Sequence, residues 1–216
     1  MFLKIIILFL LFLVGENYSK NQDRITALFI PPESKSKIYY RHSFPFKQKL
    51  GESFEHSVER VFYELLLKRI VNSTKIYSIT KRKPDAYPFY AQVKPSSADD
   101  FAKFIEVPAT TFSFTFDNFK PDIVIQIDSL AIYSSSANSS GVAVVSGLAE
   151  TLIDNTIANG DFNIDFKFYI WDNKNYKLIN AGYCEADEYS DNPTVSEWND
   201  IINEVLDKVF EDTKLE

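Results

Sequence analysis

The sequence predicts a single α+β domain with an antiparallel or mixed sheet and two main helices on one face. Two segments, about 52–71 and 194–212, repeat apolar residues at three- and four-residue spacing, which is typical of half-buried helices. Several other segments alternate apolar and polar residues, as strands with one buried face do. The 216 residues fit one domain. Because each helix has one apolar stripe to bury, we expect both to pack on the same face of the sheet.

In the first half of the chain, β-branched and aromatic residues at 24–30 and 37–41 predict two short strands. Ser53 is suited to cap the helix that begins at about residue 52. Residues 75–79 predict a third strand directly after this helix. In the first half of the sequence, predicted strands therefore both precede and follow one helix.

The segment 81–109 interrupts this pattern. It contains four prolines, which limit regular strand pairing, and a short helical candidate over 98–105. We predict an excursion between sheet strands, because long irregular segments in compact domains are often functional.

The second half is richer in strand patterns. Alternating phenylalanines predict a strand near 110–116, and an apolar run led by Pro121 predicts a longer one over 121–132. Segments 162–170 and 176–186, joined by polar turn residues, predict a hairpin.

Two segments remain between and after these strands. Residues 142–155 fit either a helix or a strand, and the Ser-rich entry with the Asn159–Gly160 exit favours the helix. Thr194 and Glu197 form a capping-box pattern that begins the final helix.

The N-terminus predicts export. Residues 5–14 are all apolar and follow Lys4, which is the pattern of a secretory signal peptide. The run is too short for a membrane span, which needs about 20 residues. We expect a signal peptide over 1–19, cleaved after Gly15 or Ser19, and a mature domain over 20–216 in the periplasm or envelope of a bacterium. The alternative is an uncleaved anchor in the inner membrane.

Composition narrows the class of protein. A single cysteine allows no internal disulfide. Residues 1–108 carry 17 Lys+Arg and 11 Asp+Glu, and the remainder carries 6 and 19, which gives the net charge of −7. The acidic second half argues against binding to nucleic acid. The basic first half would suit peripheral contact with anionic lipids, and the alternative, which we favour, is that the two halves fold together and interleave their charges.

The sequence contains no recognisable group of catalytic or metal-binding residues. Cys184 lies in a strand pattern, where a buried thiol is usual, and two histidines are too few for a histidine-rich metal site. The spacing of Asp161, Asn163 and Asp165 resembles a calcium loop, but Phe166 replaces the required glycine, so the polar face of a strand explains them better. We predict no catalytic residue, no metal and no cofactor.

Apolar residues beyond the needs of a core indicate a binding surface. The excursion 85–105 and the small-residue segment 142–153 are the candidates for contact with an apolar ligand or a partner. A satellite core is the alternative for the same residues. The candidate side chains are Tyr87, Phe89, Phe101, Phe104, Val145 and Leu148.

The order of elements resembles small bacterial envelope lipoproteins, namely auxiliary lipoproteins of lipid-transport ABC systems and similar outer-membrane lipoproteins. The residues that carry the likeness are 27–32, 51–66, 121–125 and the hairpin 162–186. The lipobox cysteine of those families is absent here, because Glu16 stands in its place. The resemblance implies an envelope location and supplies no catalytic residue.

Together these observations predict an exported, non-catalytic periplasmic or envelope-associated module that binds a partner protein or an amphiphile. The alternative is an exported hydrolase whose catalytic set is assembled only in the fold. A Ser, Cys or Asp side chain beside His42 or His56 in a cleft would favour that alternative.

Overall fold

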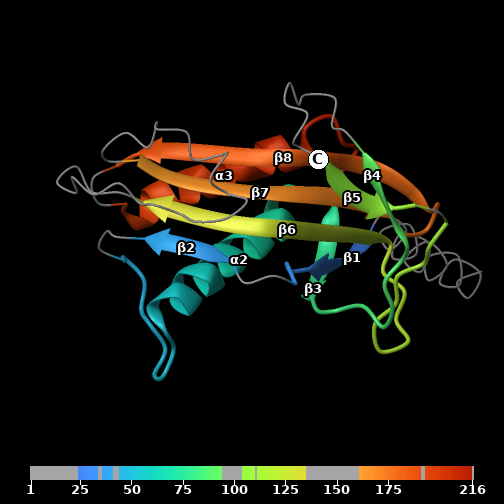
Figure 1. Cartoon of the computed structure of the whole chain (residues 1–216), viewed down its shortest axis with the longest axis horizontal. Helices are drawn as coiled ribbons and strands as arrows, with labels where there is room; N and C mark the ends of the chain where they lie inside the picture. The colour runs from blue at the N-terminus through green and yellow to red at the C-terminus, as the bar shows by residue number, and fades with distance from the viewer. Residues whose placement is uncertain are drawn as a thin grey trace, which may run out of the picture.

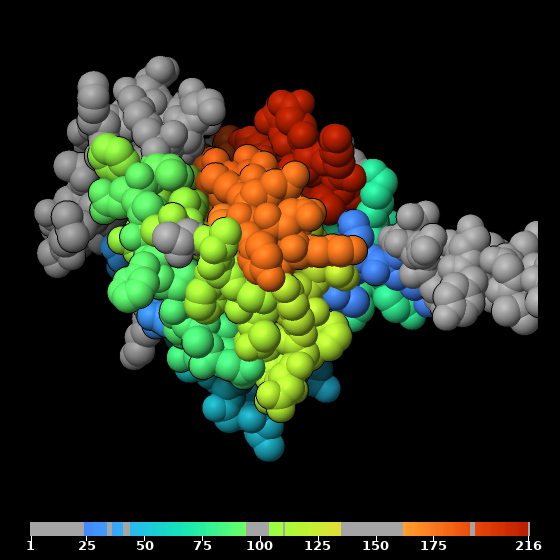
Figure 2. All heavy atoms as spheres, turned by 90° about the vertical axis from the view of Figure 1, so that its right-hand side faces the viewer, coloured from blue at the N-terminus to red at the C-terminus, as the bar shows by residue number. Residues whose placement is uncertain are grey.

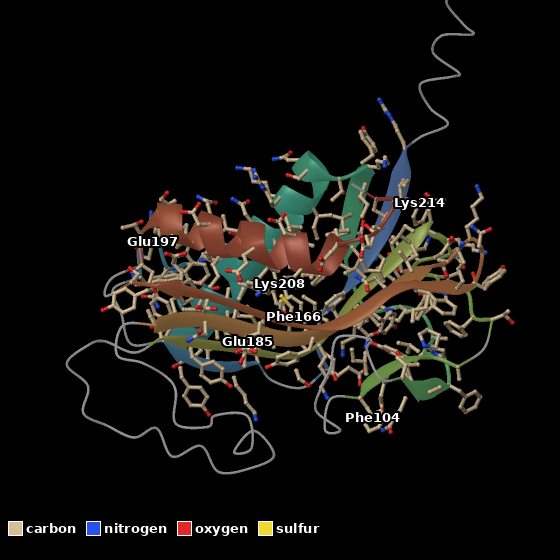
Figure 3. The ribbon with its side chains drawn as sticks, turned by 90° about the horizontal axis from the view of Figure 1, so that it is seen from above. Phe104, Phe166, Glu185, Glu197, Lys208 and Lys214 are labelled. Carbon is tan, nitrogen blue, oxygen red and sulfur yellow. The ribbon has the colours of Figure 1, made fainter. Side chains whose placement is uncertain are left out.

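A mixed sheet forms the centre of the molecule, with two helices on one face and a two-stranded ribbon on the other (Figures 1 and 3). The structure is a computed structural model. It describes residues 24–33, 36–40, 44–93, 104–109, 111–134, 161–190 and 193–215. This architecture confirms the predicted single-domain α+β fold with a mixed sheet.

The first part of the sheet is parallel. Strand β1 (Ile25–Ile30) lies between β3 (Ile76–Lys81) and β6 (Ile123–Ser134) and runs parallel to both. Strand β2 (Lys37–Tyr40) is also parallel to β6, but pairs further along it, from Ala131 to Ser134. Strands β1 and β2 therefore follow one another along the same edge of β6.

Side-chain hydrogen bonds fix the start of this pairing. The backbone N–H and the hydroxyl of Thr26 donate to the Asp122 carboxylate at 2.9 and 2.7 Å. The two residues are 96 positions apart in the sequence. Asp122, which follows Pro121 at the start of the strand predicted over 121–132, thus anchors β6 to β1.

The second part of the sheet is antiparallel. Strands β7 (Asp161–Asp172) and β8 (Lys177–Tyr189) form the predicted hairpin, and β7 also pairs with β6. On the helix side of the hairpin, Phe168 of β7 lies opposite Gly182 of β8, and Phe166 lies opposite Cys184. Large side chains on one strand thus face small ones on the other, which leaves room for a helix to pack.

The two helices are α2 (Phe54–Ser73) and α3 (Val195–Phe210). Ser53 caps α2, because its hydroxyl accepts the backbone N–H of His56 at 3.2 Å. Thr194 and Glu197 form the predicted capping box at the start of α3. Both helices pack on one face of the sheet, as predicted from their single apolar stripes (Figure 3).

The main core lies between these helices and the sheet. The largest side chain at its centre is Trp198, which is fully buried against Phe162 of β7. Cys184 is also fully buried there, as expected for a thiol in a strand. Burial of this kind accounts for most of the folding free energy.

The opposite face of the sheet carries a second, smaller core. Strands β4 (Tyr90–Val93) and β5 (Ile105–Pro108) form an antiparallel ribbon that packs on it. Ile105 and Val107 of the ribbon are buried against residues of β1, β6 and β7. These sheet residues are Leu28, Ile30, Val124, Tyr169 and Trp171. The described parts of the segment 81–109 therefore include a ribbon that covers one end of the sheet.

Two sequence-based expectations are wrong. Residues 111–115 do not form a strand, and only an isolated bridge joins Phe116 to Phe119. Their alternation reflects burial of Phe114 in the second core instead. The expected helix over 98–105 also fails at its described end, because Ile105 begins β5. Residues 142–155 lie outside the described part of the chain, as does the predicted signal peptide.

Within the described residues, neither helix is long and apolar enough to cross a membrane.

Candidate functional site

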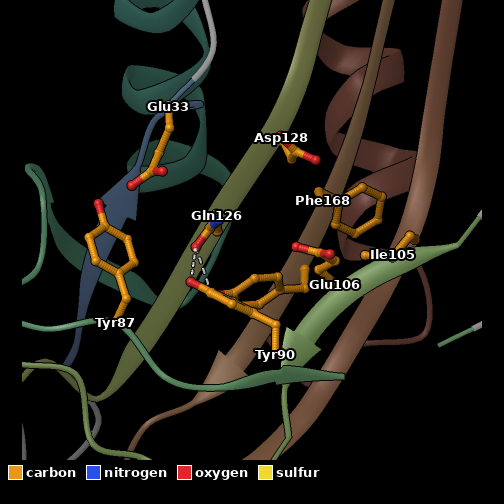
Figure 4. A pocket seen from close by; sticks show the side chains of 9 residues that line it. Glu33, Tyr87, Tyr90, Ile105, Glu106, Gln126, Asp128 and Phe168 are labelled. Atoms are coloured by element: carbon orange, nitrogen blue, oxygen red, sulfur yellow. Dashed lines mark hydrogen bonds between the residues drawn. The ribbon is translucent and has the colours of Figure 1, made fainter. Parts of the chain in front are cut away.

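A pocket of about 340 Å³ lies between the β4–β5 ribbon and the face of the sheet that is opposite the helices. Its walls come from the residues after β1, from the approach to β4, from β5 and from the middle of β6 and β7 (Figure 4). The lining residues are Glu33, Tyr87, Tyr90, Ile105, Glu106, Gln126, Asp128, Phe168 and Tyr169. Segments far apart in the sequence thus build one concave site.

The fold creates this pocket because the ribbon covers only one end of the sheet. Figure 2 shows that end, where the ribbon (green) lies beside residues 111–120 (yellow-green) and the β7–β8 turn (orange). Further along β6, the ribbon no longer covers the sheet. Gln126 and Asp128 lie at this transition and replace the apolar residues that a covered strand would have.

A hydrogen-bond network orders one wall of the pocket. The hydroxyl of Tyr169 donates to Gln126 Oε1 at 2.7 Å, and the hydroxyl of Tyr90 lies 3.5 Å from the same oxygen (Figure 4). Tyr169 is nearly fully buried and Tyr90 is partly buried. Burial raises the pKa of both hydroxyls, so both stay neutral at physiological pH.

The other wall is acidic. Glu33 and Tyr87 face each other across its edge (Figure 4), and burial, followed by a side-chain hydrogen bond with Glu33 and the charge of that residue, raises the pKa of Tyr87 to about 12. Glu106 of β5 and Asp128 of β6 add two further carboxylates. The lining residues include three carboxylates and no lysine or arginine. The lining is therefore rich in hydrogen-bond acceptors, and Lys167 of β7 lies opposite Asp128 on the neighbouring strand.

The residues that the sequence singled out fall into two groups. Tyr87 lines the pocket and is partly exposed, while Phe89 and Phe104 directly precede the lining residues Tyr90 and Ile105. Phe89 is 89% exposed, and Phe104, on the ribbon side of the sheet in Figure 3, is 41% exposed. Phe101, Val145 and Leu148 lie outside the described residues. That the described three contact a ligand stays a prediction.

The polar lining was missed from the sequence. Gln126 carries the one recognisable signal, because it is a polar residue inside the apolar run of β6. Glu33, Glu106 and Asp128 look like ordinary surface charges in the sequence. Only the fold shows that they converge on one pocket.

The residues considered for catalysis lie elsewhere. His56 is exposed on α2, and it is the backbone N–H of His56 that donates to the Ser53 hydroxyl. Burial raises the pKa of the Cys184 thiol to about 12, which leaves it unreactive at neutral pH. His42 lies outside the described residues. Asp161 and Asp165 lie along β7, so these residues form a strand and not a calcium loop.

Comparison with protein-family models and with curated protein sequences finds no match. Two solved structures resemble the chain weakly. The hypothetical protein CT253 from Chlamydia trachomatis is 11% identical, with 76% of this chain and 72% of that chain covered and a TM-score of 0.31. A structure from Helicobacter pylori, described as a neuraminyllactose-binding hemagglutinin homolog, is 12% identical, with 86% and 80% covered and a TM-score of 0.28. At such low TM-scores neither likeness bears on function.

Proposed function

We propose that the chain is an exported, non-catalytic module of the bacterial envelope that binds an amphiphile at the pocket between the β4–β5 ribbon and the sheet. The observation that carries the proposal is a polar pocket with exposed aromatic residues next to it. The polar end of the ligand would occupy the pocket, and its apolar part would lie against the ribbon. The apolar run at residues 5–14 supports export.

The size of the pocket favours a headgroup as its occupant. Small-molecule sites usually measure about 300–1,000 Å³, and this pocket, at about 340 Å³, is near the lower limit. An acyl chain attached to the headgroup must therefore leave the pocket. Phe89 and Phe104 flank the lining residues and offer apolar surface outside it.

The chemistry of the lining favours binding over catalysis. The lining residues include no serine, cysteine, lysine or histidine, and the groups of nucleophile or base type among them are three exposed carboxylates and three tyrosine hydroxyls. The buried hydroxyl of Tyr169 is already bonded to Gln126. Such a network orients a bound group.

The test is to purify the full-length chain from crosslinked bacterial envelopes and to identify what comes with it by mass spectrometry. We expect an enriched lipid or other amphiphile. The Phe89→Ser and Phe104→Ser variants should each retain less of it, because each removes apolar contact area outside the pocket.

Tyr189→Ser is the matched control. Tyr189 is also an exposed aromatic residue, but it lies at the far end of β8, where β8 pairs with Asp161. This variant should retain as much amphiphile as the unchanged chain. A free monomer without any enriched lipid would contradict the proposal, and an enriched protein alone would replace the amphiphile by a protein partner.

A further inference from the structure

The two edge strands of the sheet differ in how they are protected. The strand order β3-β1-β6-β7-β8 leaves β3 and β8 at its two ends. An edge strand exposes unpaired backbone N–H and C=O groups, and natural proteins block such edges with charged side chains or prolines. On β8, the ammonium of Lys208 donates to the carbonyl of Glu185, and Asp187 and Glu188 add two charges. The β8 edge is therefore protected against pairing with another strand.

The β3 edge lacks this protection. Its residues 77–80 include neither a charged residue nor a proline. Lys81, at the end of the strand, is directed to the helix side, where its Nζ lies 3.7 Å from the centre of the Tyr63 ring of α2. In the part of the chain that the structure describes, residues 77–81 form backbone hydrogen bonds only with β1. The outer backbone groups of β3 are thus available to another strand.

A groove of about 240 Å³ lies beside this edge, on the side of the sheet that carries the ribbon. Small-molecule sites usually measure at least about 300 Å³. The groove is lined by uncharged residues, namely Thr26, Ala27, Ser78, Thr80, Phe116 and Phe119. Its volume and its lining suit one uncharged side chain of a bound peptide.

The two phenylalanines of the groove are held in place by a tight turn. The backbone N–H of each donates to the carbonyl of the other, at 2.9 and 2.8 Å. Asp117 and Asn118 between them have positive φ angles of 49° and 64°, as in the two-residue turns of β-hairpins. The rings of Phe116 and Phe119 lie 5.1 Å apart, and Phe119 is 45% exposed. The groove therefore has an exposed aromatic wall that an apolar side chain would cover.

Three exposed cations flank β3. The guanidinium carbon of Arg24 lies 4.3 Å from the centre of the Tyr77 ring, near the start of the strand. Lys75 directly precedes β3, and Lys83 follows it. These three side chains form no salt bridge with the described residues. A bound segment with acidic residues at its ends would complement them.

Neighbouring acidic residues lower this positive field but act on other groups. Asp122 binds Thr26, Asp117 pairs with Arg82, and Glu59 and Glu64 of α2 act on Lys81. The flanking cations also argue against a second copy of this chain as the occupant, because two β3 edges would bring like charges together.

We propose that β3 is the docking site for an extended segment of a partner protein, which pairs with the free edge of β3 and places one apolar side chain in the groove against Phe119. In such strand addition, main-chain hydrogen bonds give affinity and a side-chain pocket gives specificity. This goes beyond the amphiphile function proposed above and uses none of its residues.

The experiment selects short random peptides, displayed on phage, on the purified full-length chain. We expect the enriched peptides to be rich in β-branched residues, with one aromatic or large aliphatic residue and with acidic ends. Hydrogen exchange with the best peptide, made synthetically, should show new protection of the backbone amides of residues 77–81 and no change along β8.

Methylation of the peptide backbone tests strand pairing directly. Every second residue of a strand directs its N–H to the same neighbour. N-methylation of one alternate set of peptide residues should therefore abolish binding, and N-methylation of the other set should change the affinity by no more than about twofold.

Variants test the groove and the charges. Phe119→Ser should weaken peptide binding about tenfold, because the bound side chain loses its aromatic wall. Tyr189→Ser, an exposed aromatic residue at the far end of β8, is the matched control and should have no effect. Lys83→Glu should weaken binding about two- to fivefold, as expected for an exposed ion pair. Lys177→Glu, which changes an exposed lysine at the start of the other edge strand, should not.

Several outcomes would overturn the proposal. These are no enriched peptide, protection at residues outside β3, and equal binding of the two N-methylated peptides. A dimer of the chain alone with protected β3 amides would replace the partner by a second copy. Unchanged affinity in Phe119→Ser would remove the groove from the site. None of these results bears on the amphiphile, which is tested through Phe89 and Phe104, so the two proposals can fail separately.

Discussion

The side-chain amide of Asn173 bonds both backbone polar groups of Phe114. Its Oδ1 accepts the Phe114 N–H at 2.7 Å, and its Nδ2 donates to the Phe114 carbonyl at 2.9 Å. The same nitrogen donates to the Pro121 carbonyl at 2.7 Å, and Asn173 is fully buried. The Asn173 side chain thus supplies to Phe114 the two backbone hydrogen bonds that a neighbouring strand would supply.

We expect Asn173→Ala to destabilise the fold by about 2–4 kcal/mol, because it leaves buried backbone groups without partners. Urea unfolding measures this loss. Asn175→Ala is the matched control, since Asn175 lies in the same turn but is exposed, and its backbone and side-chain N–H groups donate to the Asp172 carboxylate. A loss of equal size in both variants would show that the turn, and not the buried amide, is responsible.

Gly182 leaves room for Phe168, the residue opposite it on β7. A Cβ atom at position 182 would lie 3.0 Å from two carbons of the Phe168 ring. We expect Gly182→Ala to destabilise the fold by about 1–3 kcal/mol through overpacking. The double variant with Phe168→Leu should lose less than the sum of the two single changes, because the smaller side chain relieves the contact. Strict additivity would contradict this explanation.

The Cys184 thiol should not react in the folded protein. Full burial denies reagents access, and burial raises its pKa to about 12, so the thiolate is rare at neutral pH. With an excess of a thiol reagent such as Ellman's reagent, we expect no reaction on mixing and then a slow reaction at the rate of unfolding. The chain in concentrated guanidinium should react at once. Rapid reaction without denaturant would show that β8 is accessible.

Stability should fall in acid partly through Glu52. Hydrogen bonds from Arg60, the largest cause, lower the pKa of Glu52 from 4.5 to about 2. A lowered pKa stabilises the folded state above the ordinary value and loses this effect as the pH falls toward the folded value. The difference in stability between the unchanged chain and Glu52→Gln should therefore be constant above pH 5 and shrink between about pH 4.5 and about pH 2.

Urea titrations at several pH values measure this difference. Glu188→Gln, which removes a carboxylate from β8, controls for the loss of a negative charge elsewhere. A difference for Glu52→Gln that stays constant down to pH 2 would contradict the role of the Arg60 pair.

Periodicity allowed much of this fold to be predicted, because one buried face repeats at 3.6 residues in a helix and at two residues in a strand. The stripes of α2 and α3 and the alternation along β7 are clear examples. The same rule failed for residues 111–116, where alternating phenylalanines pack in the second core and an asparagine 59 positions away replaces the partner strand. An alternating pattern indicates which side of a segment is buried, but it does not indicate which part of the chain covers that side.

The candidate site could be predicted only in its aromatic part. Tyr87, Phe89 and Phe104 stood out because aromatic residues exceed the needs of a Pro-rich loop. The carboxylates of Glu33 and Asp128 did not stand out, because their meeting depends on parallel pairing between β1 and a strand almost 100 residues later. Long-range register of this kind leaves no mark in a local pattern.

The placement of β1 and β2 along one edge of β6 also bears on the timing of folding. Thr26 meets Asp122 only after the chain between them has been made, so neither β1 nor β2 can complete its pairing early in synthesis. Contacts of such long range slow folding. We expect the N-terminal half to remain unfolded during synthesis, which pulsed hydrogen exchange on stalled chains would reveal. In the export proposed above, that delay would keep the chain unfolded, as translocation across a membrane requires.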